Sequence, residues 1–312
     1  MKKILVVLLL LLLCGCSSDN GELSIVCPSG APSLAFYNEL HNDSFHTGDA
    51  QSILPELKSD VGSDIVVIDT VNGIKALNAG ANYKLAATIT FGNFYIASTG
   101  IDDNEIMEDG DYIVLFSKGA TPDLIFHYLY GNEMESNIHY VSAVSDASAC
   151  LIKGINILDD QRTIDEDPYV EYVMIAEPAL SVALLKNDKA SIYLDVQEEY
   201  MNKSDGLFMI QASVFVSNRL SNEIVDEFLN SLENNINFLL DNPNLFIEET
   251  SELSDDEIKD IFGVPNGKIA SKILSDNSIG LSYRRSSEIK DTIDRMLNIF
   301  DVGKTNEEIY YK

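Results

Sequence analysis

Residues 84–98, KLAATITFGNFYIAS, decide the architecture of this chain because they read as β-structure but are too long for one strand of a small sheet. Gly92 interrupts the run and predicts a bend. A second long β-like segment covers residues 206–217, GLFMIQASVFVS. The two segments predict that the chain crosses from a first lobe to a second lobe and later returns.

The rest of the chain supports a sheet with helices on both faces. From Leu23 onward, short apolar runs such as DIVVID (64–69) alternate with helical patterns, which is typical of a parallel α/β sheet. A polar, acidic segment at 99–111 interrupts this alternation before it restarts, and everything after the second crossover is predicted to be helical. We therefore predict one lobe from 23–98 plus 212–312 and another from 99–211. Paired crossovers form a hinge that can close on a ligand.

The N-terminus predicts export. Ten apolar residues, 4–13, follow Lys2 and Lys3, whereas a membrane-spanning helix needs about 20 apolar residues. The pattern fits a secretory signal, and its end, LCGC, resembles the bacterial lipobox, in which the cysteine after the cut receives a lipid. We expect a lipoprotein signal peptide at 1–15, lipidation of Cys16, a tether at 16–22 and an extracytoplasmic, lipid-anchored location. A plain signal peptide cut nearby and an apolar start to a cytosolic domain are the alternatives.

Charge and cysteine content limit the partners. The formal net charge is −29, and loss of Lys2 and Lys3 makes it two units more negative. Such a field repels phosphate backbones and anionic lipid heads, so we expect no nucleic-acid binding. We also expect the lipid on Cys16, and not the protein surface, to hold the chain at the membrane. Cys27 and Cys150 lie in apolar segments and are expected to be buried free thiols, with a single bridge between them as the alternative.

Five strand-to-helix junctions carry small, hydroxyl or acidic residues. In an open parallel sheet such junctions meet at the carboxyl ends of the strands, where ligands bind, and helix-start N–H groups can receive polar ligand atoms. Each junction alone can equally be an ordinary helix cap. The junctions contain Ser29 and Gly30, Asp69 and Thr70, Gly119 to Pro122, Ser145 and Asp146, and Glu177.

Enzyme signatures fail in this sequence. GVPNGKIASK (263–272) lacks the spacing and the hydroxyl residue of a phosphate-binding loop, and there is no G-x-S-x-G nucleophile elbow. There is also no C-x-x-C pair and no H-E-x-x-H motif for zinc. We therefore predict neither an enzyme nor a bound cofactor or metal.

Several motifs together resemble a known family. SIVCPSGAPSLAFY, DIVVIDTVNGIKALNAG, KLAATITFGNFYIAS, SKGATPD and IAEPALSVAL occur in an order similar to that in substrate-binding lipoproteins of ABC importers, of the nitrate, sulfonate and thiamine-precursor type. The tail from 287 to 312 is also similar, so the resemblance covers nearly the whole mature chain, although an acidic insertion at 159–167 departs from it. The resemblance implies a two-lobed type II periplasmic-binding fold. It also implies a ligand site formed by Ser29, Gly30, Ala31, Asp69, Thr70, Asn72, Gly119, Thr121, Pro122 and Glu177.

The leading hypothesis is therefore a monomeric solute-binding protein that delivers a small organic solute to ABC permease subunits. An anchored sensor or adhesion lipoprotein without a transport role is an alternative, as is an enzyme on the same fold. Asp69 and Glu177 favour a ligand with nitrogen donors, such as a thiamine-precursor-like pyrimidine, over nitrate or a sulfonate. Lys118 is the only cation at the junctions. The nearest rings for stacking are Phe36, Tyr37, Phe91, Phe94 and Tyr95.

Overall fold

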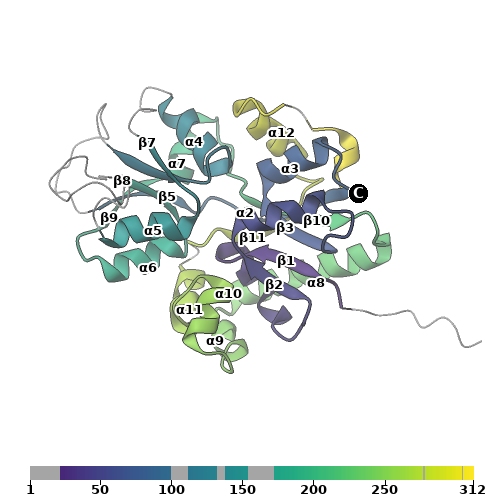
Figure 1. Cartoon of the computed structure of the whole chain (residues 1–312), viewed down its shortest axis with the longest axis horizontal. Coiled ribbons are helices and arrows are strands. Elements are labelled where there is room, and N and C mark those ends of the chain that lie inside the picture. The colour runs from purple at the N-terminus through teal and green to yellow at the C-terminus, as the bar shows by residue number, and fades with distance from the viewer. Residues whose placement is uncertain (1–21, 100–111, 132–137, 154–171, 277, 304) are drawn as a thin grey trace, which may run out of the picture.

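The computed structural model describes residues 22–99, 112–131, 138–153, 172–276, 278–303 and 305–312, which form two lobes with one β-sheet each (Figure 1). The predicted signal peptide at 1–15, Cys16, nearly all of the tether at 16–22 and the acidic insertion at 159–167 lie outside these residues. Within them, no helix combines the length and the apolar character needed to cross a membrane.

The first sheet is mixed, and its central strands are buried on both faces. β1 pairs in parallel with β2 and β3, whereas β10 runs antiparallel between β3 and β4. The carboxyl ends of β1 and β3 therefore meet at one edge of the sheet. The strand order is β11 (Leu281–Arg285), β4 (Tyr83–Thr90), β10 (Ala212–Ser217), β3 (Ile65–Asp69), β1 (Ile25–Pro28) and β2 (Phe45–Gly48).

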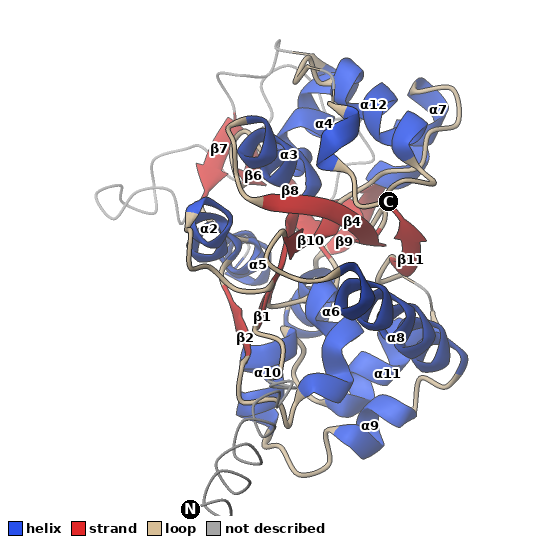
Figure 2. Cartoon of the chain, turned by 90° about the vertical axis from the view of Figure 1, so that its right-hand side faces the viewer, coloured by secondary structure: helices blue, strands red, loops and turns tan. Residues whose placement is uncertain are grey.

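Helices cover both faces of this sheet (Figure 1 and Figure 2). The long α8 places an apolar stripe of period 3.6 against it, with Val225, Leu229 and Ile236 buried. On the same face lie η1 (Ala31–Glu39), α8 (Asn222–Asp241), α9 (Leu245–Glu249), α10 (Asp255–Phe262) and α11 (Gly267–Ser275). On the other face lie α2 (Ala50–Ile53), η2 (Leu54–Lys58), α3 (Thr70–Asn78), α12 (Lys290–Ile299) and η4 (Glu307–Ile309).

The second sheet repeats the plan with fewer strands. β6 pairs in parallel with β7 and β8, and β5 runs antiparallel between β8 and β9. The order is β7 (Ile138–Val141), β6 (Ile113–Phe116), β8 (Tyr172–Ala176), β5 (Phe94–Ser98) and β9 (Ser191–Asp195). Its helices are α4 (Thr121–Tyr130) and α7 (Val196–Lys203) on one face, and α5 (Val144–Lys153) and α6 (Ala179–Lys186) on the other (Figure 1).

Two crossovers connect the lobes. The first is only 91–93, because β4 pairs in the first sheet and β5 in the second. The predicted bend is present, since Gly92 has φ +46°, but the predicted boundary at 98 falls after β5 instead of before it. The second crossover runs from the end of α7 to β10, which begins at Ala212, where the first lobe is predicted to resume.

The region after the second crossover is not wholly helical as predicted. β11 pairs with β4 at the edge of the first sheet. Leu281 and Tyr283 are buried, whereas Ser282 and Arg284 are more exposed, which is the alternation of a half-buried strand rather than the pattern of a helix. The last helix, α12, is present as predicted and packs into the core through Ile293 and Met296, which are fully buried.

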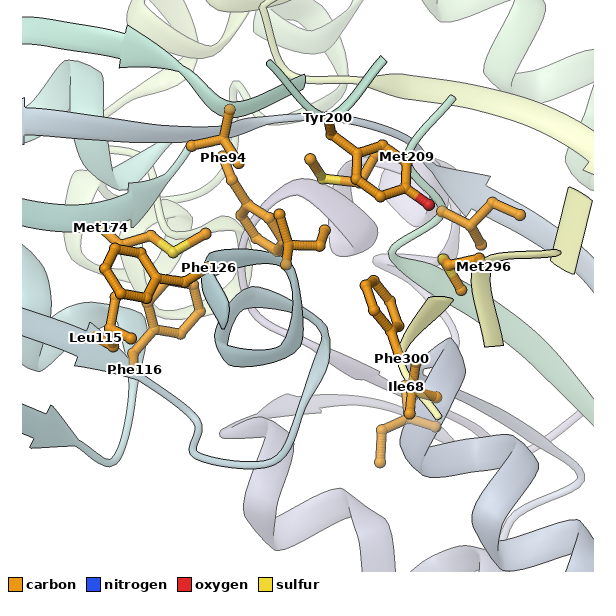
Figure 3. Close-up of a cluster of buried hydrophobic side chains, with 14 of the residues drawn as sticks. Ile68, Phe94, Leu115, Phe116, Phe126, Met174, Tyr200, Met209, Met296 and Phe300 are labelled. Atoms are coloured by element: carbon orange, nitrogen blue, oxygen red, sulfur yellow. The ribbon is translucent and has the colours of Figure 1, made fainter. Parts of the chain in front are cut away.

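A continuous apolar cluster joins the two lobes behind the crossovers (Figure 3). Tyr200 of α7 lies with its ring centroid 6.4 Å from that of Phe300, which follows α12. Met209 of the second crossover and Met296 of α12 belong to the same cluster. The lobes therefore share packed side chains on the side of the molecule where the chain crosses.

The two thiols are confirmed as buried and free. Cys27 on β1 and Cys150 on α5 have no exposed surface and form no bridge with each other. Burial raises the pKa of both thiols, that of Cys150 to about 11, so neither is ionised near neutral pH.

Candidate functional site

A cleft of about 750 Å³ lies between the lobes. The loops that follow β1, β3, β6, β7 and β8 line it, and so do residues of both crossovers. It therefore lies at the carboxyl ends of the parallel strands of both sheets, where ligands bind in open α/β folds. Its size is that of a small-molecule site.

Six of the ten predicted site residues line this cleft. They are Ser29, Gly30, Ala31, Asp69, Pro122 and Glu177. The other four, Thr70, Asn72, Gly119 and Thr121, lie beside it without lining it.

Thr70 and Asn72 serve the fold. The Thr70 hydroxyl is fully buried, donates to the Gln211 carbonyl oxygen at 2.8 Å and lies 2.7 Å from the Ser213 hydroxyl. The Asn72 backbone N–H donates to Asp69 Oδ1 at 2.9 Å, which caps α3. A hydroxyl at the end of a strand can form a hydrogen bond with a ligand or with a neighbouring strand. The Thr70 hydroxyl forms its hydrogen bonds with β10 and the residue that precedes it.

Gly119 and Thr121 make contacts between the lobes. The Thr121 backbone N–H, at the first position of α4, donates to Asp69 Oδ2 at 3.3 Å. Lys75 Nζ of α3 donates to the Gly119 carbonyl oxygen at 3.0 Å. A third link joins Gln51 Nε2 to the Ser142 carbonyl oxygen at 3.1 Å. The two lobes are therefore hydrogen-bonded to each other across the cleft.

Asp69 accepts hydrogen bonds from the first turns of two helices, α3 in its own lobe and α4 in the other lobe. α4 has Ala120 at its N-cap, and this residue has no side chain that could satisfy the first N–H groups. The Asp69 carboxylate supplies that acceptor from the opposite lobe while it also caps its own helix. Burial raises the pKa of Asp69, and the hydrogen bonds from Thr121 and Asn72 and the charge of Lys75 oppose the rise.

Glu177 is a buried carboxylate in the cleft wall. It is 6% exposed, and its two oxygens accept from the Ser181 backbone N–H at 3.0 Å and the Ser181 hydroxyl at 2.8 Å. Burial raises its pKa, which the two bonds from Ser181 partly oppose. The carboxyl therefore caps α6 and also faces the cleft.

Ser29 and Gly30 form the opposite wall. The Ser29 hydroxyl donates to the Asp260 carbonyl oxygen at 2.9 Å, which ties the loop after β1 to the end of α10. Gly30 has φ +117°, a conformation that strongly favours glycine, and it lies close to Pro178 and Gly263. The wall is thus a close meeting of three backbone segments.

Two amides on the cleft floor were not predicted from the sequence. Asn93 in the first crossover and Gln211 in the second are 3% and 7% exposed, and Gln211 Nε2 donates to Asn93 Oδ1. Nothing in their local sequence marks them as site residues. A weak signal was their position in the two predicted crossover segments, since both crossovers must pass through the floor of an interlobe cleft.

Rings and hydroxyls of the second lobe complete the lining. Phe94 and Phe116 both line the cleft and pack edge to face with ring centroids 5.8 Å apart (Figure 3). Phe94 was among the predicted aromatics, whereas Phe116 was not. Phe36 and Tyr37 lie in the core instead, and Phe91 packs on Phe208. Ser142, Ser145 and Ser148, around the start of α5, also line the cleft.

The lysines that line the cleft are not the one that was predicted. Lys118 places its Nζ 4.3 Å from the centroid of the Tyr140 ring and does not line the cleft. Lys186 and Lys259 do line it, but both are exposed. Among the described lining residues there is no arginine, and no group of three His, Cys, Asp or Glu suited to a metal ion occurs in the described part of the chain.

Comparison with known proteins finds similarity in structure. No family model and no curated protein matches the chain. An ABC transporter protein of Parabacteroides distasonis is similar with a TM-score of 0.67 at 19% identity, over 94% of this chain and 99% of the other. The alkanesulfonate-binding protein SsuA of Xanthomonas axonopodis pv. citri, bound to MOPS, gives 0.61 at 13% identity, over 95% and 96%. A Candida albicans protein with the generic periplasmic binding protein fold gives 0.53 at 10% identity, over 92% of each chain.

The chain has the periplasmic-binding-protein fold. This confirms the predicted two-lobed architecture, with its cleft between two sheets and its paired crossovers. One fold can host many unrelated functions, so the fold alone identifies no solute. The ligand must be argued from the groups that line the cleft.

Proposed function

We propose that this chain is an extracytoplasmic solute-binding protein, held at the membrane by a lipid on Cys16. In this proposal it acts as a monomer, captures a small organic solute between its lobes and delivers it to the permease of an ABC importer. The observation that carries the proposal is the cleft, which receives residues from both lobes and from both crossovers. Similar structures described as ABC transporter or ABC-type import components support the transport role.

The proposed ligand is a flat organic solute with nitrogen donors. Glu177 and Asp69 supply carboxylate oxygens, and Phe94 and Phe116 supply ring surface. A sulfonate, which one similar structure binds, is the competing ligand class. It is less suited to this cleft because the described cations that line it are exposed lysines at its edge.

A thermal-shift screen tests the proposal. The panel contains heteroaromatic amines, vitamins and their precursors, aliphatic amines, sulfonates and nitrate. A ligand present at about 100 times its Kd stabilises the folded state by about 2.7 kcal/mol, which is readily measured. We expect a heteroaromatic amine to raise the unfolding temperature. If only sulfonates or nitrate raise it, the amine class is wrong while the binding function stands.

A matched pair of variants separates cleft binding from surface binding. Ala149→Trp fills the cleft from α5, and Asn234→Trp adds the same ring to an exposed position of α8. The shift should disappear in the first variant and persist in the second. Solute uptake after deletion of the gene then separates a transport protein from an anchored sensor, because a sensor leaves uptake unchanged.

The lipid anchor has its own test. Mass spectrometry of the mature N-terminus should find Cys16 as the first residue, carrying a lipid. Cys16→Ser should leave the precursor unprocessed or release the protein from the membrane. An unmodified N-terminus at another residue would contradict the anchor and leave the solute-binding proposal intact.

A further inference from the structure

Gln211, on the floor of the cleft, carries a buried hydrogen-bond acceptor for which the described residues provide no partner. Gln211 precedes β10 in the second crossover, lines the cleft and is 7% exposed. Its backbone is fully engaged, since its N–H donates to the Thr90 carbonyl oxygen at 3.0 Å and its carbonyl accepts from the Thr70 backbone N–H at 2.7 Å. The residue is therefore held in place from both sides.

Neighbouring carbonyl groups determine which way its side-chain amide points. Asn93 Nδ2 lies 3.2 Å from the Glu177 carbonyl oxygen and 3.0 Å from the Ile279 carbonyl oxygen. Carbonyl oxygens only accept, so this atom must be the nitrogen, and Asn93 Oδ1 must be the atom that faces Gln211. Gln211 then has to donate its Nε2 to Asn93, as it does.

These hydrogen bonds fix the orientation of both side-chain amides, so Gln211 Oε1 lies on the side of its amide that does not face Asn93. Among the described residues, Gln211 Oε1 is buried and has no hydrogen-bond partner. Buried polar atoms without partners are rare in native proteins and frequently mark a functional position. Flipping the amide would not relieve it, because two acceptor oxygens would then face each other at Asn93.

We propose that Gln211 Oε1 accepts a hydrogen bond from an N–H group of the bound solute and thereby selects an amino-substituted heterocycle. The inference rests on the proposed solute-binding function and narrows its ligand class. The rings of Phe94 and Phe116 line the same cleft and suit a flat heterocycle. An acceptor that cannot reorient discriminates against solutes that place another acceptor, or a methyl group, at this point.

Two probes that differ only in the donor test the inference. The first is 4-amino-2-methylpyrimidine, and the second is 2,4-dimethylpyrimidine, in which a methyl group of similar size replaces the amino group. Titrations followed by ligand-observed NMR give the Kd of each probe. We expect the wild-type protein to bind the amino probe about tenfold more tightly, which corresponds to one hydrogen bond.

Variants then assign this discrimination to Gln211. Gln211→Met keeps the length of the side chain and removes the acceptor, so the ratio of the two Kd values should fall to about one. Asn237→Leu removes an amide from an exposed position of α8 outside the lining of the cleft, and the ratio should be unchanged. The wild-type comparison uses no variant, so the inference remains testable if Gln211→Met does not fold.

Three results would overturn the inference: equal binding of the two probes to the wild-type protein, a preference that persists in Gln211→Met, or no binding of either probe. In each case the solute screen decides the proposed function separately. Another solute that binds in the cleft leaves that function standing, whereas a screen without any bound solute overturns it.

Discussion

At the scale of single residues, Glu177 stands out because its carboxylate is buried and therefore poorly solvated when it is charged. Burial raises its pKa above the ordinary value of 4.5. Above the raised pKa, the folded protein carries a buried charge that the unfolded chain keeps in water, so ionised Glu177 lowers stability at neutral pH. Below 4.5 the group is protonated in both states and the penalty is absent. Such a penalty is tolerable where a ligand uses the charge.

We therefore expect Glu177→Gln to raise the unfolding temperature at about pH 7.5 and to leave it unchanged at about pH 4. The amide can still accept from the Ser181 N–H and donate to the Ser181 hydroxyl, so α6 remains capped. Thermal unfolding followed by circular dichroism across this pH range measures the effect. A gain that is the same at both pH values would show that the charge is not its cause.

Glu257 provides a control of opposite sign. Its carboxylate accepts from the Ser254 N–H and hydroxyl in a capping box, and these bonds lower its pKa. Its charge is favoured in the folded state, so Glu257→Gln should lower the unfolding temperature at neutral pH, and the loss should shrink as the pH falls below 4.5 and through the lowered pKa.

The site residues show what sequence can predict at this scale. Ser29, Asp69 and Glu177 were found because they follow apolar strands, and strand ends meet at one edge. The same reasoning also named Thr70, which does not line the cleft, because sequence does not reveal that β10 returns beside β3 and takes the hydroxyl. Gln211 was missed for the same reason, since its environment comes from residues distant in the chain.

At the scale of elements, α3 packs against the sheet through Gly73. Gly73 faces β10, and a Cβ atom at this position would overlap the ring of Phe215. The glycine therefore sets how closely the helix after β3 approaches the sheet. The same helix begins at Asp69, so its position also determines where that carboxylate lies.

We expect Gly73→Ala to lower the free energy of unfolding by about 1–3 kcal/mol through overpacking, despite the higher helix propensity of alanine. Urea unfolding measures the change. Phe215→Leu removes the part of the ring that the new methyl group meets, so the double variant should lose less than the two single variants together. Additive losses would mean that the two residues do not meet in this way.

The elements also show where prediction from sequence ends. Residues 84–98 were predicted to carry the first crossover because their length exceeds that of one strand and Gly92 breaks the run. The lobe boundary was nevertheless expected at 98, whereas β5 already belongs to the second sheet. β2, β9 and β11 were not predicted. All three lie at sheet edges, where only one neighbour pairs with them, so their sequences carry weaker apolar patterns than the buried central strands.

At the scale of the whole molecule, the lobes are held together on two sides. Behind the crossovers they share the apolar cluster that includes Tyr200 and Phe300. Across the cleft they are joined by hydrogen bonds, among which the bond from Thr121 to Asp69 satisfies a helix start that has no cap of its own. Separation of the lobes would break this bond, so we expect Asp69 to favour the closed arrangement.

We therefore expect Asp69→Ala to shift the population of unliganded molecules toward an open form, with a larger radius of gyration in small-angle X-ray scattering. Asp195→Ala is the matched control, because Asp195 caps α7 by accepting from Gln197 and Glu198 within one lobe. Each variant should lose about 0.5–2 kcal/mol of stability from its missing cap, but only Asp69→Ala should expand. A solute that binds both lobes should compact Asp69→Ala again, since it favours the closed form. Equal dimensions of the two variants, with and without a tight ligand, would show that neither Asp69 nor the solute controls closure.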